Sequence, residues 1–235
     1  MTDKTQTDSA SLEHNKAKTV ALNPLIQTMF RSAGKLTLFV FISIVLLLAV
    51  RFVTAPQIAY EEKEAMLKTF NKVLPYAFYN NNPLSDTLIL SDPIQTSHLG
   101  SDSAVTIFRA RKDNLPAGLI FSVIAPNGYS GKITLLMGVF PNGTVSGVRV
   151  LKHRETPGLG DKIDENKHDW ILSFNGKSID FQHDTDFDDD HRWAVKRDGG
   201  EFDQFTGATI TPRAVIGAVK KALLFIKENG DDLYE

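Results

Sequence analysis

A run of apolar residues without a polar face limits what this chain can fold into. Residues 36–50 contain only Thr37 and Ser43 as polar interruptions, and Lys35 and Arg51 bracket them. Both cations are long enough to reach water from within a bilayer, and at ~1.5 Å per residue 33–53 would cover about one hydrocarbon core. We expect one retained transmembrane helix at 33–53. A cleaved signal peptide is the alternative, although the preceding segment is long for one.

This span divides the chain into four parts. We expect a flexible cytoplasmic tail at 1–32, the transmembrane helix at 33–53, a juxtamembrane helix and loop at 54–102, and a folded domain at 103–235. The count of Lys and Arg near the two ends of the span is almost balanced. It leans toward an N-terminus inside the cell and a bulk domain outside.

The pattern beyond the span predicts an α+β domain, with antiparallel strands and helices packed on one side. Apolar periodicity predicts a juxtamembrane helix closed by Pro75, a helix at 164–174, and an amphipathic helix at 212–227. Residues 75–102 are rich in Asn, Pro, Ser and Asp, and we expect them to form a loop. Another strand is indicated by Phe187, Trp193 and Val195. Four runs of β-branched and aromatic residues predict strands at 104–110, 118–125, 132–140 and 145–152. A tight turn at 141–144 is predicted to join the last two.

Composition excludes several classes of site. The chain has no cysteine, which removes thiolate-held iron–sulfur clusters, disulfides and thiol catalysis. A formal net charge of −2 argues against a nucleic-acid partner. The acidic run 184–190 departs from a calcium loop, because Asp189 stands in place of the required glycine and Val195 in place of the last glutamate. The six histidines lack metal-ligand spacing, so no metal site is expected, and no nucleophile–base set indicates a hydrolase.

Residues 203–212 carry the chemistry that the rest of the chain lacks. Thr211 and Pro212 predict a helix start, with Thr211 as the N-cap residue. A helix N-terminus offers free N–H groups and a partial positive charge, to which Arg213 adds a full one. The segment therefore indicates either an anion site or a plain strand–turn–helix junction.

Small side chains lie just before this helix start. Gly207 and Ala208 would let a bulky group approach the backbone closely, and the hydroxyls of Thr206 and Thr209 flank them. A phosphate attached at Thr209 would meet the helix end two residues later.

Two segments resemble the signatures of one family. Asp-x-x-Thr-Gly-Ala-Thr at 203–209 resembles the recognition motif of proteins that carry flavin mononucleotide (FMN) through a threonine phosphoester, and 153–162 resembles the other signature of that FMN-binding domain. The match is closest to the G subunit of Rnf-type (Rsx) electron transport complexes. The sister family is the C subunit of the sodium-translocating NADH:quinone oxidoreductase, which usually has Ser where Thr206 stands. The longer tail and the acidic run depart from the family pattern.

The resemblance implies a role for each matched residue. Thr209 would be the attachment residue, and a flavin transferase would move FMN from FAD onto its hydroxyl, recognising the motif that begins at Asp203. Residues expected to contact the phosphate or the ribityl chain are Thr206, Gly207 and Ala208. Those expected in the loop facing the flavin are Glu155, Thr156, Gly158, Leu159 and Gly160.

The function implied is that of a membrane-anchored flavoprotein subunit of an ion-translocating electron transport complex linking NADH and ferredoxin pools. It would pass electrons between the other subunits and have no independent catalysis. The family's flavin domain lies outside the bacterial inner membrane, so the C-terminal domain would be periplasmic and the N-terminus cytoplasmic. The alternative is a cofactor-free single-span subunit that serves assembly or partner binding.

Overall fold

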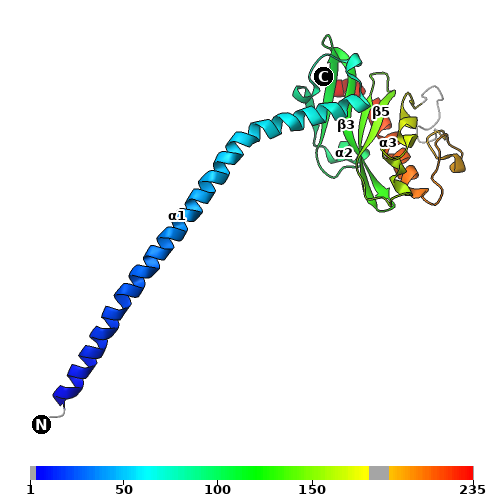
Figure 1. Cartoon of the computed structure of the whole chain (residues 1–235). Coiled ribbons are helices and arrows are strands. Elements are labelled where there is room, and N and C mark those ends of the chain that lie inside the picture. Colours follow the sequence, from blue (N-terminus) through cyan, green and yellow to red (C-terminus); the bar gives the residue numbers. More distant parts are fainter. Residues whose placement is uncertain (1–3, 180–190, 235) are drawn as a thin grey trace. The chain divides into compact units, whose positions relative to one another are not determined.

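The computed structural model describes residues 4–179 and 191–234 (Figure 1). The chain forms two compact units, Met1–Glu64 and Ala65–Glu235. Helix α1 (Lys4–Val73) makes up the described part of the first unit, and its last residues, 65–73, belong to the second. The acidic run 184–190, including Phe187, lies outside the described residues.

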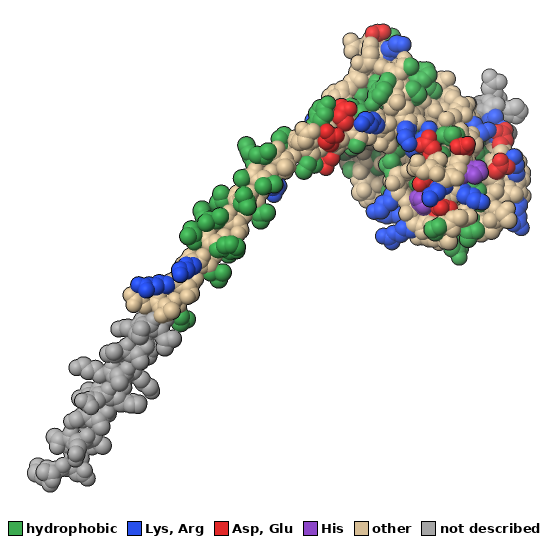
Figure 2. Space-filling view, viewed as in Figure 1, with side chains coloured by type: hydrophobic (Ala, Val, Ile, Leu, Met, Phe, Trp, Pro, Cys, Tyr) green, Lys and Arg blue, Asp and Glu red, His purple; other side chains and the backbone are tan. Residues whose placement is uncertain are grey.

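The first unit is helical well beyond the predicted span. The described part of α1 contains an 18-residue window of mean hydropathy 2.7 with no buried side chain, so α1 is long and apolar enough to cross a membrane. Figure 2 shows apolar side chains gathered along this part of the helix. Residues 4–32 are helical where the sequence predicts a flexible tail, because they continue the helix of the apolar span and extending a helix costs less than starting one. The predicted juxtamembrane helix is the C-terminal part of α1.

The second unit is built on a five-stranded antiparallel sheet whose strands lie in chain order. The four predicted strands are confirmed, and the α+β class with them. The strands are β1 (Thr87–Leu90), β2 (Val105–Lys112), β3 (Leu115–Gly128), β4 (Gly131–Val139) and β5 (Val145–Lys152).

Tight turns fix the register of this meander. Asp113 and Asn114 have φ values of 52° and 65°, which suits a two-residue hairpin turn between β2 and β3. The predicted turn at 141–144 joins β4 to β5. There, Gly143 has a φ of 79° and its N–H donates to the Phe140 carbonyl at 2.9 Å. Glycine adopts this left-handed conformation without the steric cost of a side chain.

Helix α3 (Ile210–Tyr234) covers one face of the sheet and closes the main core. It contains the whole of the predicted helix 212–227. Alternate residues of β3, such as Leu119, Phe121 and Val123, point into this core, as a strand with period two requires. The predicted apolar face of α3 is buried against them: Val215, Ile216, Val219, Leu223 and Ile226.

The end of α1 covers the opposite face of the sheet with a smaller core. Phe70, Val73 and Leu74 pack there with Tyr79 on side chains that include Ile120. The helix lies close to the sheet because β4 and β5 carry glycines. A Cβ at Gly138 would lie 2.4 Å from the Val73 carbonyl oxygen, and one at Gly147 would lie 2.9 Å from the Val73 Cα. Pro75 then ends the helix, since the residue before a proline avoids the α region.

The structure corrects the loop predicted at 75–102. That segment holds the edge strand β1, the short helix α2 (Pro93–His98), and the 3₁₀ turns η1 (Tyr76–Phe78) and η2 (Pro83–Ser85). The Asp92 side chain caps α2 by accepting the Ile94 N–H at 2.9 Å. Elements this short depend on pairing and packing with neighbours, which local sequence patterns do not reveal.

Two further predictions are corrected between the sheet and α3. The helix predicted at 164–174 is limited to the 3₁₀ helix η4 (Asp169–Phe174), preceded by η3 (Gly160–Ile163). Trp193 and Val195 are buried but form no strand, since Val195 makes only an isolated bridge to Phe202. The chain between Val195 and Phe202 turns through η6 (Lys196–Asp198) and Gly199, whose φ is 89°.

The contact between α1 and the sheet predicts a steric effect of Gly138→Ala. The added methyl group would meet backbone atoms of Val73, which cannot rotate away, so we expect the free energy of unfolding to fall by about 1–3 kcal/mol. Urea unfolding of the detergent-solubilised full chain measures it. Gly217→Ala in α3 is the control, because nothing lies within 4 Å of its new Cβ and Ala suits a helix interior better. Equal midpoints for the two variants would contradict the close approach of α1.

The buried hydroxyl of Tyr79 predicts a loss of stability at alkaline pH. Within the described chain its oxygen has no hydrogen-bond partner, and burial raises the pKa of Tyr79 from 10.0 to about 12. The unfolded chain therefore ionises first, so the stability that the neutral hydroxyl contributes below pH 10 is lost as the pH rises through about 12. Urea midpoints across this window should fall less steeply in Tyr79→Phe than in the original chain. Identical slopes would contradict the burial of this hydroxyl.

Candidate functional site

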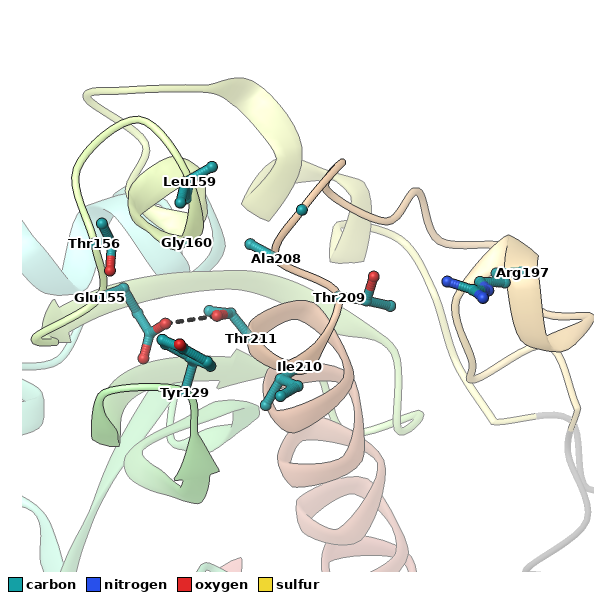
Figure 3. Close-up of a pocket in the computed structure, with 11 residues that line it drawn as sticks. Tyr129, Glu155, Thr156, Leu159, Gly160, Arg197, Ala208, Thr209, Ile210 and Thr211 are labelled. Carbon is teal, nitrogen blue, oxygen red and sulfur yellow. Dashed lines mark hydrogen bonds between the residues drawn. The ribbon is translucent and has the colours of Figure 1, made fainter.

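A cleft of about 640 Å³ opens where the loop after β5 meets the start of α3 (Figure 3). Its walls come from four separate segments: the turn between β3 and β4, the loop 155–160, the turn η6, and residues 207–211. Its lining residues are Tyr129, Glu155, Thr156, Leu159, Gly160, Arg197, Gly207, Ala208, Thr209, Ile210 and Thr211.

Thr209 caps the helix that closes the cleft. Its carbonyl oxygen accepts the Arg213 N–H at 3.3 Å, which is the first hydrogen bond of α3. The N–H groups of Ile210 and Thr211 therefore belong to the unpaired first turn, while Pro212 has no N–H to offer. The segment does start a helix, as predicted, but the helix begins at Ile210 and its N-cap residue is Thr209, two residues before the predicted N-cap at Thr211.

The turn before Thr209 brings bare main chain to the cleft. Gly207 has a φ of 80°, and the Ala208 N–H donates to the Phe205 carbonyl at 3.1 Å. A Cβ at Gly207 would meet only Leu159 Cδ2, at 3.7 Å. The backbone here is thus accessible to a bulky group from the cleft side, as the sequence predicts.

The opposite wall is a loop wound around one carbonyl oxygen. The Thr156 oxygen accepts the N–H groups of Leu159, Gly160 and Asp161 at 3.1, 3.2 and 3.4 Å. The buried Asp161 carboxylate accepts the Gly158 N–H at 2.7 Å, and Gly158 has a φ of 78°. This tight turn leaves the Leu159 side chain 43% exposed, so it offers an apolar surface to a ligand.

Glu155 lies in the floor of the cleft rather than at its surface. Only 5% of this residue is exposed. Its Oε1 accepts the Ser130 N–H at 3.1 Å, and its Oε2 accepts the Thr211 hydroxyl at 2.5 Å, the dashed line in Figure 3. The Thr211 hydroxyl is therefore committed to Glu155 and does not cap the helix.

The arginine that lines the cleft near the start of α3 is not the predicted one. Arg213 does not line the cleft; its Nε and Nη2 each donate to the Asp198 carboxylate at 2.7 Å. These hydrogen bonds lower the pKa of Asp198 and raise that of Arg213. The cation that lines the cleft is Arg197, which Figure 3 shows extending toward the side where Thr209 lies. The sequence gives no signal for this, because only the turn η6 directs it there.

Most of the predicted site residues come together in this cleft, and three do not line it. Thr206 and Gly158 are exposed at the ends of the two turns. Asp203 is exposed on a neighbouring surface, where its carboxylate lies 2.6 Å from Lys196 Nζ and its carbonyl accepts the Trp170 indole N–H at 2.7 Å. Four lining residues were not predicted as site residues, since none of them lies in either motif: Tyr129, Arg197, Ile210 and Thr211.

The segments that form the cleft belong to an FMN-binding domain. The model of the family described as "FMN-binding domain" matches residues 128–224, which include both walls of the cleft. The chain is 44% identical to the G subunit of the ion-translocating oxidoreductase complex of Vibrio cholerae serotype O1 (strain M66-2) over 181 residues, which are 77% of this chain and 82% of that protein. The chain belongs to this family, the G subunits of ion-translocating oxidoreductase complexes, which confirms the resemblance found in its two motifs.

Other members of the family match over more of the chain. The G subunit of Pseudoalteromonas atlantica is 41% identical over 199 residues, 85% of this chain and 88% of that protein. The G subunit of Aliivibrio fischeri (strain MJ11) is 40% identical over 209 residues, 89% and 95% of the two chains. Among solved structures, the crystal structure of Shewanella oneidensis NqrC is similar with a TM-score of 0.42 and 25% identity, covering 56% of this chain and 61% of that one.

The packing around Glu155 predicts that Gly160→Ala damages the cleft. The new Cβ would lie 2.6 Å from Glu155 Oε2 and 2.9 Å from Thr211 Oγ1, so the loop must shift outward. We expect the free energy of unfolding to fall by about 1–3 kcal/mol. Urea unfolding followed by tryptophan fluorescence measures it. Gly230→Ala, which adds a methyl group to α3 with no atom within 4 Å, is the control. A Gly160→Ala variant as stable as this control would contradict the packing described.

Proposed function

We propose that this chain is a membrane-anchored flavoprotein subunit of an ion-translocating electron transport complex, and that it carries electrons through FMN joined to Thr209 by a phosphoester. The observation that supports this most directly is the position of Thr209. It is partly buried, lines the cleft, and is the N-cap residue of α3. The first N–H groups of this helix have no hydrogen-bond acceptor within the helix.

The residues around Thr209 suit an esterified phosphate. A phosphate carries negative charge, which the positive end of the α3 dipole and the Arg197 guanidinium would stabilise. Gly207 and Ala208 leave the backbone open to the phosphate and the ribityl chain. The two other cations beside this segment, Lys196 and Arg213, pair with Asp203 and Asp198, so Arg197 is the cation we assign to the phosphate.

The rest of the cleft suits a broad, flat ring system. Its volume of about 640 Å³ lies within the range usual for sites of small organic ligands. Exposed apolar side chains from three elements line it: Tyr129, Leu159 and Ile210. We assign these, with the Thr156–Gly160 turn, to the isoalloxazine side of the cofactor. Bound FMN would supply the redox chemistry, and the protein would hold and orient it.

Attachment would be a transfer of the FMN moiety from FAD. The Thr209 Oγ1–phosphorus bond forms, the pyrophosphate bond of FAD breaks, AMP leaves, and the hydroxyl proton is released. Because the carboxylate that lines the cleft, Glu155, is engaged by Ser130 and Thr211, we assign this step to a separate flavin transferase. The exposed Asp203 lies outside the cleft, where such an enzyme could reach it.

The anchor supports a position at a bacterial inner membrane. The 33–53 segment lies within the apolar part of α1. We propose a cytoplasmic N-terminus and a periplasmic C-terminal domain, on the lysine and arginine distribution and the family resemblance. The relatives' description as subunits of an oxidoreductase complex supports electron exchange with other subunits of such a complex.

The attachment proposal predicts that Thr209→Val abolishes flavin binding. Valine keeps the shape of threonine but lacks the oxygen that the phosphoester needs. The intact mass of the chain from its native host should exceed the sequence mass by one FMN less one water, and its band should fluoresce after denaturing electrophoresis. Both signals should disappear in Thr209→Val.

The matched control is Thr106→Val, in β2, which does not line the cleft and should keep both signals. A fluorescent band of unchanged intensity in Thr209→Val would refute the attachment site. An unmodified mass in the original chain would instead favour a cofactor-free subunit that serves assembly or partner binding.

A further inference from the structure

Glu155 is a buried carboxylate that pairs with no cation in the part of the chain that the structure describes. Carboxylates are seldom buried this fully unless they are paired. None of the ion pairs found among the described residues includes Glu155, and its two oxygens accept one hydrogen bond each, from the Ser130 N–H and the Thr211 hydroxyl. A buried carboxylate held by two neutral donors is costly for stability alone, which indicates a role in the cleft.

The two donors join parts of the chain that are distant in sequence. Ser130 lies in the turn between β3 and β4, 25 positions before Glu155, and Thr211 lies in the first turn of α3, 56 positions after it. Glu155 itself begins the loop that carries Leu159. One carboxylate therefore connects the sheet, the Leu159 wall of the cleft and the Thr209 wall.

Two glycines lie close to the Glu155 carboxylate and leave the space that it occupies. A Cβ at Gly128 would lie 2.9 Å from Oε1, and a Cβ at Gly160 would lie 2.6 Å from Oε2. The Thr211 side chain is fully buried as well. The carboxylate is thus held by a hydrogen bond on each oxygen, in a space that a side chain at either glycine would fill.

We propose that Glu155 and Thr211 are positioning residues. Their hydrogen bond, the Glu155–Thr211 latch, fixes the distance between the two walls of the cleft and so holds the flavin ring in one orientation. The latch itself is independent of the cofactor, whereas its effect on the ring rests on the proposed function. Glu155 need not touch the flavin for this role, although the family resemblance places it in the loop that faces the flavin.

Amide hydrogen exchange of the full chain tests the latch without reference to flavin. Loss of a hydrogen bond to a charged group in Thr211→Val should speed exchange of the 156–161 backbone on the order of tenfold. Thr211→Ser keeps the hydroxyl and should exchange as the original chain does, and Thr106→Val is the control for a threonine outside the cleft. Unchanged exchange in Thr211→Val, or equally fast exchange in Thr211→Ser, would overturn the latch.

A second variant serves if Thr211→Val does not fold. Glu155→Gln accepts the Ser130 N–H and can donate to Thr211 Oγ1, but it replaces a charge-assisted hydrogen bond by a neutral one. We expect exchange of 156–161 to increase by roughly threefold. Exchange equal to that of the original chain would overturn the latch in this case.

Visible circular dichroism of the flavin tests the effect on the ring. In flavin-bearing chains, Thr211→Val should carry as much flavin by mass as the original, because Thr209 and the 203–209 motif are intact, yet show about half the flavin dichroism or less. Thr211→Ser should restore the signal. Full dichroism in Thr211→Val would overturn the positioning role. Absence of flavin from the original chain would contradict the proposed function instead, and the exchange experiment would still decide on the latch.

Discussion

The hydrogen bond between the Glu155 carboxylate and the Thr211 hydroxyl is the interaction on which the cleft depends. It joins the loop after β5 to the first turn of α3, and the Ser130 N–H ties both to the sheet. A buried carboxylate must have its acceptor capacity satisfied, so the surrounding chain is constrained to deliver these donors. The tight turn at Thr156 and the glycine at 160 follow from that constraint, because any side chain there would displace the carboxylate.

Helix α3 contributes to both the core and the site. Its apolar face, including Val215 and Val219, fills the main core against β3, which fixes where its first turn lies. That turn then presents Thr209 to the cleft. Because stability and the site depend on the same helix, the position of the proposed attachment residue is determined by the packing of residues far from it. The opposite face of the sheet is covered by the end of α1, where Gly138 allows close contact.

Local patterns predicted the elements that carry strong local signals. The strands at 104–152 and the helix at 212–227 have clear periodicity and turn residues, and all are present. Strand β1 and helix α2 were missed because both are short and are ordered mainly by neighbouring elements. Trp193 and Val195 have side chains typical of strands, but they are buried beside a turn. Trp193 is held by aromatic packing with Phe174 and Phe202 and not by the backbone hydrogen bonds of a β-sheet.

The sequence by itself determined the apolar helix, the α+β class and the two motifs, because each is a contiguous pattern of residue types. Only the tertiary structure decided which residues form the cleft. It directed Arg197 to the lining and Arg213 to Asp198, although both cations lie near the same helix start. It also committed Thr211 to Glu155 and left Thr209 as the cap. Such choices depend on partners distant in the chain, whose approach is set by how α3 and the loop after β5 pack on one sheet.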